Sequence, residues 1–541
     1  MTDATEANDM SMTWIARGQR WAATAPAWTL ALALTALGAA LRLLLIGDKP
    51  LWLDEAFSLW MARLPLSELP NWLVQIDQHP PLFYAALHCW LALGESEAVL
   101  RLFSALCSIL TIPLMYGLGA IIGGRPLGGV AALLLATAPL HVEFGQEVRM
   151  YALLTLATTL AMGGTAWLLR WPEAAAAPIG TGWRAWRQAR QTGSAAKAPL
   201  ATDLAWLAYV LGVTAALLSH NTAIFFPLAI NLIVLGWWWA RRRDRRFLRN
   251  WLLAQGAVLL LWSFWIPSLI VQSILVYREF WIPRPDLLRI LVTLQMLYAG
   301  RMGPTLWLRP WLDLIVWGMI VLGIRSWRRE PLWLAFTLGL WLIAPVGELI
   351  VSIWRPIFYI RTLVWTSIPL YLILAAGVVS LRQAPLRVRA RQITAGWALA
   401  ALLLVHLVGL ASYYFGYHKE AWDEGAAFVA ARAGSDDLIL FNATWVQLPF
   451  DYYFRRHGLT IAEHGAPVDL FDRGLEPKMT EADLPRLRAL AGAHPHVWLV
   501  YSHNWYTDPQ GLIPAELARL GTLIEQREFN GLRIEGYQIH R

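Results

Sequence analysis

Two adjacent carboxylates, Asp54 and Glu55, lie in the segment LWLDEAFSLW (51–60) among large apolar side chains. A charged side chain near a bilayer is costly, about 2.5–3.5 kcal/mol at mid-membrane. We therefore expect these acids to do chemistry, such as taking a proton from a substrate hydroxyl group. Structural alternatives stay open, because Asp54 can cap a helix and Glu55 can be an interfacial charge.

Further polar side chains gather at the ends of other apolar runs. They are His79, His141, Glu143, Glu147, Arg149, His220, Arg355, Tyr359 and Arg361. A carboxylate base together with imidazole and guanidinium groups suits transfer from a donor that carries a phosphate.

Each of these residues also has a structural alternative. His79 can fix the turn before Pro80, Glu147 and Arg149 can form an ion pair, and the arginines of WRPIFYIR (354–361) can anchor a helix end at the interface. We expect supporting or acceptor-side positions for a last group, namely Glu147, Glu143, His141, His220 and Tyr359. The histidines show no spacing to carboxylates that demands zinc, so we predict no metal and no cofactor, although a divalent ion stays open.

The composition indicates a membrane protein with many spans. Of the 541 residues, 57% are hydrophobic and 15% are charged, whereas soluble proteins average about 25% charged residues. A helix needs about 20 apolar residues to cross a bilayer. Eleven runs are candidate spans, with an uncertainty of one or two because 127–140 is short. They lie at 28–46, 98–121, 127–140, 150–170, 203–219, 222–240, 250–272, 311–325, 331–352, 362–381 and 394–413.

The distribution of basic residues predicts the orientation of these spans. Arg-rich loops such as RRRDRRFLR (241–249) alternate with loops poor in Lys and Arg, and basic loops stay in the cytoplasm. The N-terminus is then cytoplasmic, and the loops 47–97 and 141–149 are on the outer side. We interpret 80–94 as an amphipathic or re-entrant helix on the outer face, because another span there would invert every later loop. Nucleic acid is not an expected partner.

The last part of the chain differs from the rest. Residues 414–541 contain 12 Lys and Arg against 17 Asp and Glu, and apparent helices alternate with strands. This pattern predicts a small α/β domain with VWLVYS (497–502) as its central strand. We therefore divide the chain into a membrane domain, 1–413, and an extracytoplasmic domain, 414–541.

Four blocks of the sequence, in the same order along the chain, resemble a known protein family. They are DEAFS (54–58), DQHPPLFYAALHCWLALGESEAVLRLFSAL (77–106), APLHVEFGQEVRMYAL (138–153) and RPIFYIRTLVWTSIPLYLILAAG (355–377). Together they resemble bacterial membrane glycosyltransferases of the protein O-mannosyltransferase type. These belong to the GT-C superfamily, with the lipid A aminoarabinose transferases and the oligosaccharyltransferases.

The resemblance implies a GT-C fold and a function. The enzyme would move a sugar from a polyprenyl-phosphate donor to a hydroxyl group of a lipid, glycan or protein, with inversion, at the outer face of the bacterial cytoplasmic membrane. Asp54 matches the family's catalytic acid, with Glu55 beside it, and His79 would approach the donor phosphate. We expect Arg149, Arg361 and Arg355 to bind the same phosphate, because arginine can donate two parallel hydrogen bonds. Arg149 stands where some relatives carry another acid, which weakens a metal interpretation.

Two other functions stay open. A polysaccharide ligase of similar fold would use a diphosphate-linked donor. A lipid or sugar transporter would need polar residues at mid-membrane, whereas the charges here gather on one side.

Overall fold

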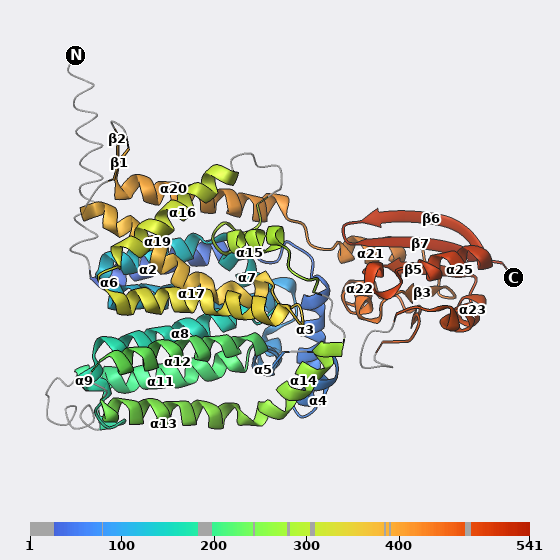
Figure 1. Cartoon of the computed structure of the whole chain (residues 1–541). Coiled ribbons are helices and arrows are strands. Elements are labelled where there is room, and N and C mark those ends of the chain that lie inside the picture. Colours follow the sequence, from blue (N-terminus) through green and yellow to red (C-terminus); the bar gives the residue numbers. More distant parts are fainter. Residues whose placement is uncertain are drawn as a thin grey trace, which may run out of the picture.

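A helical bundle carries a small α/β domain at one end (Figure 1). The computed structural model describes residues 26–77, 79–181, 197–241, 244–278, 282–302, 309–383, 386–388, 391–470 and 478–540. We call the end of the bundle that meets the α/β domain the domain end. The predicted fold class, a polytopic helical protein with a C-terminal α/β domain, is confirmed.

The bundle consists mainly of long apolar helices. In chain order these are α2 (Ala27–Leu43), α6 (Glu97–Thr137), α7 (Pro139–Gly145), α8 (Tyr151–Arg170), α11 (Lys197–Leu217), α12 (Phe225–Ala240), α13 (Arg245–Trp262), α14 (Ile266–Arg278), α15 (Leu287–Ala299), α16 (Arg309–Ser326), α17 (Pro331–Ser352), α18 (Ile360–Leu363), α19 (Ser367–Gln383) and α20 (Ala395–Ala411). Between α19 and α20 a short hairpin pairs β1 (Leu386–Val388) with β2 (Arg391–Ile393).

Eight stretches of the described residues are long and apolar enough to cross a membrane. They are Glu97–Thr137, Tyr151–Arg170, Leu200–Leu217, Asn221–Ala240, Arg245–Ile274, Pro331–Ser352, Ile360–Arg382 and Ala395–Gly416. The chain is a multi-pass membrane protein. Every predicted span coincides with a helix, but the number eleven itself stays a prediction.

The longest helix, α6, is two helices joined at a sharp turn. Gly123 and Gly124 leave helical geometry, and Gly124 has φ of 81°, a conformation that glycine adopts at little cost. This break separates the predicted spans 98–121 and 127–140. The two halves pack so closely that a Cβ atom on Gly119 would lie only 2.7 Å from the Cα atom of Gly128.

Short helices fill the domain end of the bundle. They are α3 (Leu53–Arg63), α4 (Leu69–Ile76) and α5 (Leu82–Trp90), which continues as a 3-10 turn to Leu93. At 1.5 Å per residue, the stretch from Leu82 to Leu93 is about 18 Å long. It is too short to cross a hydrocarbon core of about 30 Å, and Figure 1 shows α5 at the domain end.

The C-terminal domain is built on a five-stranded sheet in the order β4-β3-β5-β7-β6. The strands are β3 (Leu438–Phe441), β4 (Ala462–Gly465), β5 (His496–Tyr501), β6 (Gly521–Phe529) and β7 (Leu532–Ile539). Strand β3 runs parallel to β4 and β5, whereas β7 runs antiparallel to both β5 and β6. The segment VWLVYS therefore forms the central strand, as predicted.

Helices cover both faces of this sheet. The helices are α21 (Trp422–Ala430), α22 (Gln447–Phe454), α23 (Leu484–Gly492), α24 (Asn504–Thr507) and α25 (Leu512–Leu520). Leu438 and Leu499 pack under α23 and α25, while Ile439 and Val500 face α21 and α22. This second face belongs to the same apolar cluster as the bundle interior, so the domain is docked firmly on the bundle.

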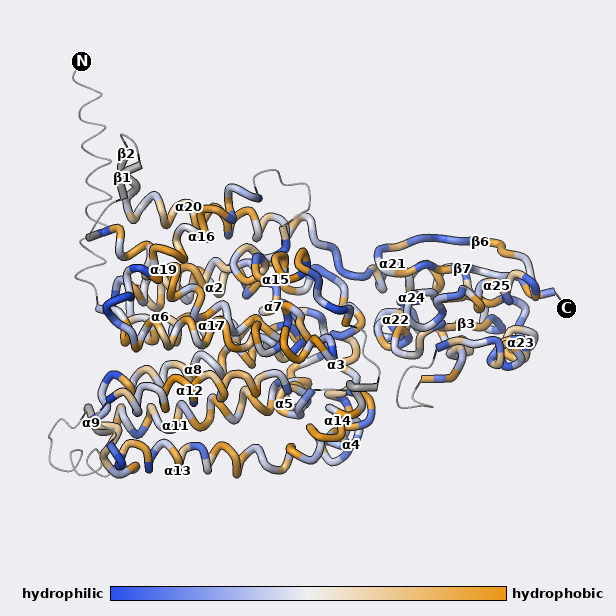
Figure 2. The backbone as a smooth tube through the Cα atoms, viewed as in Figure 1, coloured by the Kyte–Doolittle hydropathy of each residue, from blue (hydrophilic) through white to orange (hydrophobic). Residues whose placement is uncertain are grey.

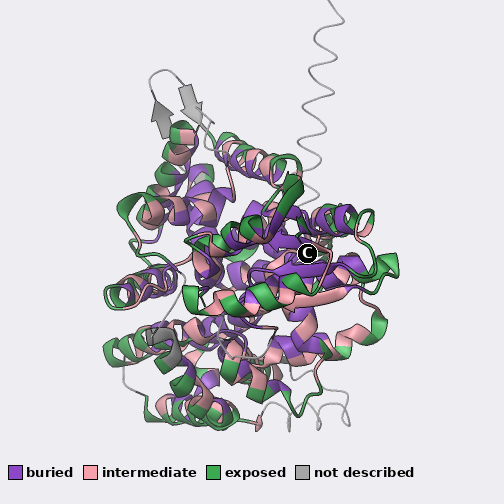
Figure 3. Cartoon of the chain, turned by 90° about the vertical axis from the view of Figure 1, so that its right-hand side faces the viewer, coloured by how far each residue is buried: buried purple, intermediate pink, exposed green. Residues whose placement is uncertain are grey.

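The distribution of polarity fits this arrangement. Figure 2 shows hydrophobic segments along the bundle helices and hydrophilic ones at the junction with the C-terminal domain. Seen from the domain end, buried residues gather towards the centre and exposed residues lie on the outer helices (Figure 3). The segment before α8 is itself buried, since all residues from His141 to Met150 are buried. Polar groups in that segment must therefore find partners within the protein.

Candidate active site

Asp54 lies in the first turn of α3 with its carboxylate partly open to solvent. Its Oδ2 atom accepts a hydrogen bond of 2.6 Å from Nη1 of Arg361, and its side chain is 28% exposed. The guanidinium of Arg361 also lies 4.5 Å above the ring of Trp52 and 5.4 Å from that of Tyr359. Two residues 307 positions apart are thus joined at the domain end, and aromatic rings fix the arginine.

Arg149 lies next to this pair from the other side. Its Nη1 atom contacts the Asp54 carbonyl at 3.5 Å, the Ser58 hydroxyl at 3.3 Å and the Tyr84 hydroxyl at 3.2 Å. Its Nε atom is buried and has no hydrogen-bond partner among the described residues. A buried donor without a partner is costly, and an anionic ligand would satisfy it.

A polar chain extends from Arg149 to His79. The Tyr84 hydroxyl donates to Oδ2 of Asp77 at 2.6 Å, and Oδ1 of Asp77 lies 2.8 Å from Nδ1 of His79. The His79 ring in turn meets that of His220 edge to face at 4.9 Å. Burial would raise the pKa of Asp77, but the charges and hydrogen bonds of its neighbours, first His79, lower it to about 2. Asp77 thus holds His79 in place as an ionised partner.

Glu55 has very different surroundings from Asp54. Its carboxylate is fully buried and accepts hydrogen bonds from Arg101 at 2.9 and 2.8 Å, from Lys419 Nζ at 2.8 Å and from the Val148 backbone at 3.0 Å. Burial alone would raise its pKa, but Arg101 and Lys419 outweigh burial and lower it to about 2. Every acceptor position is occupied, so this group is suited to holding α3 in place rather than to taking a proton.

Glu147 is a further acid near the site and, unlike Asp54, it is buried. Its side chain is 5% exposed, and no hydrogen bond or ion pair reaches the carboxylate within the part of the chain that the structure describes. Burial raises its pKa, while the positive charges of Arg361 and Lys419 oppose this rise. A buried carboxylate between two cations can accept hydrogen bonds from a bound substrate.

Other predicted residues lie farther from Asp54 or act as supports. Glu143 pairs with Arg301 at 2.6 Å, and that guanidinium lies 4.7 Å from the ring of Tyr417. His141 lies 2.6 Å from the Ser367 hydroxyl on α19. The buried His220 accepts a hydrogen bond from the backbone of Thr222, and burial, with His79 next, lowers its pKa well below the usual range. Half-buried Arg355 lies in the loop before α18.

Several partners of these residues were not predicted from the sequence. Arg101 lies near the start of the predicted span 98–121, which was identified from its apolar residues alone. Lys419 lies near the boundary between the two predicted domains. Tyr84 lies in a segment that reads as purely apolar. The available signal was the buried charge itself, because an arginine inside a span needs a partner.

The C-terminal domain also holds α3 directly. Glu420 accepts a hydrogen bond of 3.1 Å from the Leu53 backbone at the start of α3 and another of 2.7 Å from the Trp422 indole. The Tyr453 hydroxyl accepts a bond of 2.7 Å from the Leu51 backbone. Free N–H groups at a helix start need such acceptors, so the domain supports the helix that carries Asp54.

No group of three or more His, Cys, Asp or Glu side chains is arranged to hold a metal ion in the described residues. The absence of a metal from the reaction stays a prediction.

Part of the sequence matches a known protein family. Residues 78–170 match the family described as dolichyl-phosphate-mannose-protein mannosyltransferase. The matched segment contains His79 and the loop 141–149 but not Asp54. No curated protein matches the sequence.

Several solved structures have the same fold along nearly the whole chain. ArnT from Cupriavidus metallidurans in the apo state superposes with a TM-score of 0.57 and 13% identity, over 93% of this chain and 97% of that one. The same protein bound to undecaprenyl phosphate gives 0.55 and 14%, over 95% and 98%. The archaeal oligosaccharyltransferase AglB from Archaeoglobus fulgidus, in complex with an inhibitory peptide and a dolichol-phosphate, gives 0.52 and 12%, over 96% and 75%.

Identities this low establish the fold alone. The chain therefore has the GT-C fold, and the resemblance to GT-C membrane glycosyltransferases that its sequence motifs indicate is confirmed.

Proposed function

We propose that the chain is an inverting glycosyltransferase that moves a sugar from a polyprenyl-phosphate donor to a hydroxyl acceptor. The observation that carries the proposal is the partly open Asp54 carboxylate, paired with Arg361 and next to the unsatisfied Nε atom of Arg149. The fold supports it, because relatives of this fold were solved with undecaprenyl phosphate and with a dolichol-phosphate. We place the reaction at the domain end, outside the bacterial cytoplasmic membrane.

The chemistry follows from these side chains. Asp54 takes the proton of the acceptor hydroxyl, whose oxygen then attacks the anomeric carbon of the donor sugar. The bond from that carbon to the phosphate oxygen breaks, and polyprenyl phosphate leaves with the electron pair. Arg149, Arg361 and His79 stabilise the charge on the leaving phosphate, as pre-oriented hydrogen-bond donors and positive charges do in a water-poor site. A single displacement inverts the anomeric configuration.

Transfer from synthetic donors tests the proposal. Purified protein in lipid nanodiscs is supplied with undecaprenyl-phosphate sugars or with the corresponding diphosphates, and the products are identified by mass spectrometry and NMR. We expect transfer from the monophosphate with inverted configuration, unchanged by a chelator. Transfer from the diphosphate alone indicates the ligase function, and transfer lost on chelation shows that a metal takes part.

A further inference from the structure

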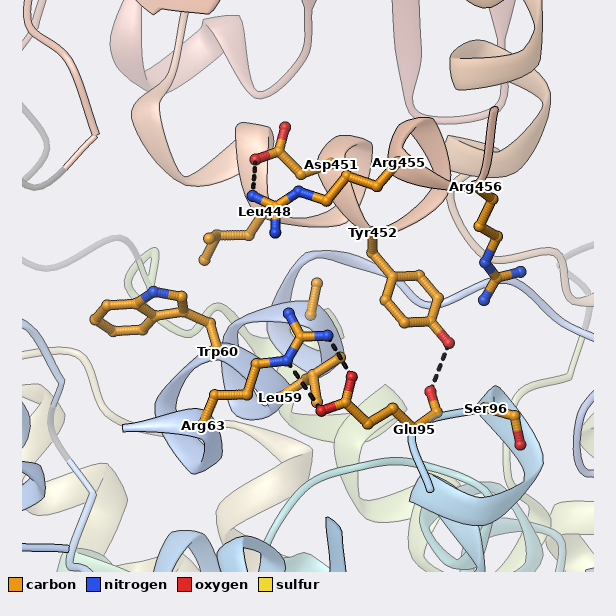
Figure 4. A pocket seen from close by; sticks show the side chains of 11 residues that line it. Leu59, Trp60, Arg63, Glu95, Ser96, Leu448, Asp451, Tyr452, Arg455 and Arg456 are labelled. Atoms are coloured by element: carbon orange, nitrogen blue, oxygen red, sulfur yellow. Dashed lines mark hydrogen bonds and ion pairs between the residues drawn. The ribbon is translucent and has the colours of Figure 1, made fainter. Parts of the chain in front are cut away.

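A pocket of about 410 Å³ lies between the C-terminal domain and the loops of the domain end (Figure 4). Trp60 and Arg63 of α3 form one wall, and Asp451, Tyr452 and Arg455 form the other. The residues of a helix advance by about 100° each, so Leu59 and Arg63 lie on the face of α3 opposite to Asp54. The mechanism proposed above does not use this pocket.

Aromatic side chains shape the pocket and are held in place. The Trp60 ring packs edge to face against Trp72 at 5.4 Å and against Trp445 at 6.4 Å. The Tyr452 hydroxyl donates to the Glu95 carbonyl at 2.8 Å. Fixed aromatic rings offer flat apolar surfaces with a wet edge, and the C–H face of a sugar ring is a matching apolar surface.

The polar groups of the pocket are arranged in pairs of opposite charge. The ion pairs are Arg63–Glu95, Arg455–Asp451 and Arg456–Glu97. Paired in this way, the side chains present both donors and acceptors while their charges largely balance. Sugar hydroxyl groups also donate and accept at once, so this lining suits a neutral polyhydroxylated ligand better than a free phosphate.

Asp451 adds a donor to this lining. It is 8% exposed, and burial, together with the nearby Glu463 carboxylate, raises its pKa to about 8. Near neutral pH the two neighbouring carboxyl groups therefore hold one proton and one negative charge between them, so Arg455 still faces an anion while the protonated group can donate as well as accept.

We propose that this pocket binds a saccharide unit of the acceptor that does not itself react, so that the acceptor is a glycan or a glycolipid. The role of this saccharide as part of an acceptor rests on the proposed glycosyl transfer, whereas saccharide binding in the pocket does not depend on it. A helix with its side chains is about 10–12 Å thick. The bound unit therefore lies on the far side of α3 from Asp54, and the reacting hydroxyl belongs to another part of the same molecule.

Photoaffinity labelling tests the proposal. The full chain carrying Asp54→Asn, in lipid nanodiscs, is exposed to diazirine-bearing methyl glycosides of mannose, glucose and N-acetylglucosamine, and the labelled peptides are mapped by mass spectrometry. We expect label in α3 and in α22 for at least one glycoside. Because its side chain is 73% exposed, Arg455→Ala leaves the fold intact and should weaken binding about tenfold. Trp60→Ala should do the same.

Arg519→Ala serves as the matched control, because this arginine is 74% exposed and forms a comparable ion pair on α25. Label confined to peptides with Arg149 and Arg361, an absence of label with all three glycosides, or equal labelling of Arg455→Ala and Arg519→Ala would overturn the proposal. Competition by inorganic phosphate but not by the untagged glycosides would overturn it too, in favour of an anion site. If the pocket is labelled while the unsubstituted chain transfers no sugar from any lipid phosphate, the saccharide site stands and the proposed function fails.

Discussion

Asp54 and Glu55 are neighbours in the sequence but have opposite surroundings. One carboxylate is partly open and meets a single arginine, while the other is buried between Arg101 and Lys419. The motif alone could not separate their roles, because both lie in the first turn of α3 and the partners of Glu55 come from distant segments. The helix rotation of about 100° between them decides which one reaches the site.

This difference predicts that removing the Glu55 carboxylate lowers the stability of the folded protein. Glu55→Ala leaves two buried cations unpaired, which costs about 3–5 kcal/mol in other proteins. We expect the midpoint of thermal unfolding in detergent to fall strongly. Glu68→Ala, which removes an exposed acid before α4, is the control, and an equal midpoint for both variants would contradict the assignment of Glu55.

The contribution of Glu55 also depends on pH. Its folded pKa of about 2 lies below the usual 4.5, so its stabilisation is fully present above pH 4.5 and is lost as the pH falls towards 2. The gap between the unfolding midpoints of the unsubstituted chain and Glu55→Gln should narrow over that window. A gap that widens on acidification would show that the ionised form is not the stabilising one.

The residues proposed to bind the phosphate predict a loss of donor affinity when each is replaced. Arg149→Ala, Arg361→Ala and His79→Ala each remove a proposed phosphate contact, and a hydrogen bond to a charged group is worth about 1.5–3 kcal/mol. We expect binding of undecaprenyl phosphate, measured by calorimetry in nanodiscs, to weaken about tenfold or more. Arg432→Ala, whose ion pair is on the surface of the domain, should bind normally. Unchanged affinity in all three variants would place the phosphate elsewhere.

At the scale of elements, the C-terminal domain holds the start of α3. Glu420→Ala removes the acceptor of the Leu53 N–H group, so we expect faster hydrogen exchange in residues 51–60 and a lower turnover number. Donor affinity should stay within about twofold, since Arg149 and Arg361 are untouched. Glu528→Ala, which is on an exposed part of the sheet, is the control. Unchanged exchange in residues 51–60 would show that the contact does not order the helix.

Most elements could be predicted from the sequence, because their signals are local. Apolar runs located the long helices of the bundle, and the alternation of apparent helices and strands indicated the α/β domain, with VWLVYS as its central strand. The contacts of Arg361, Lys419 and Arg101 were not predictable, because no local pattern records which distant helix end meets Asp54.

At the scale of the whole molecule, the two ends of the bundle should lie on opposite sides of the membrane. The basic segments next to α9 (Pro172–Ala175) and at the start of α13 lie away from the domain end (Figure 1), and positive loops stay in the cytoplasm. Reporter fusions after Pro178 and after His540 should therefore give cytoplasmic and extracytoplasmic signals, respectively. Equal sidedness of the two fusions would contradict the orientation, and with it the proposed place of the reaction.

The proposed reaction depends on Asp54 as the base, and one substitution tests this most directly. Asp54→Asn keeps the size of the side chain and its contact with Arg361 but cannot take a proton, so transfer should fall by about 10²–10⁴-fold. Its unfolding midpoint and its affinity for undecaprenyl phosphate should stay close to those of the unsubstituted chain. An Asp54→Asn protein that transfers sugar at a near-native rate would contradict the account and would move the search for the base to Glu147.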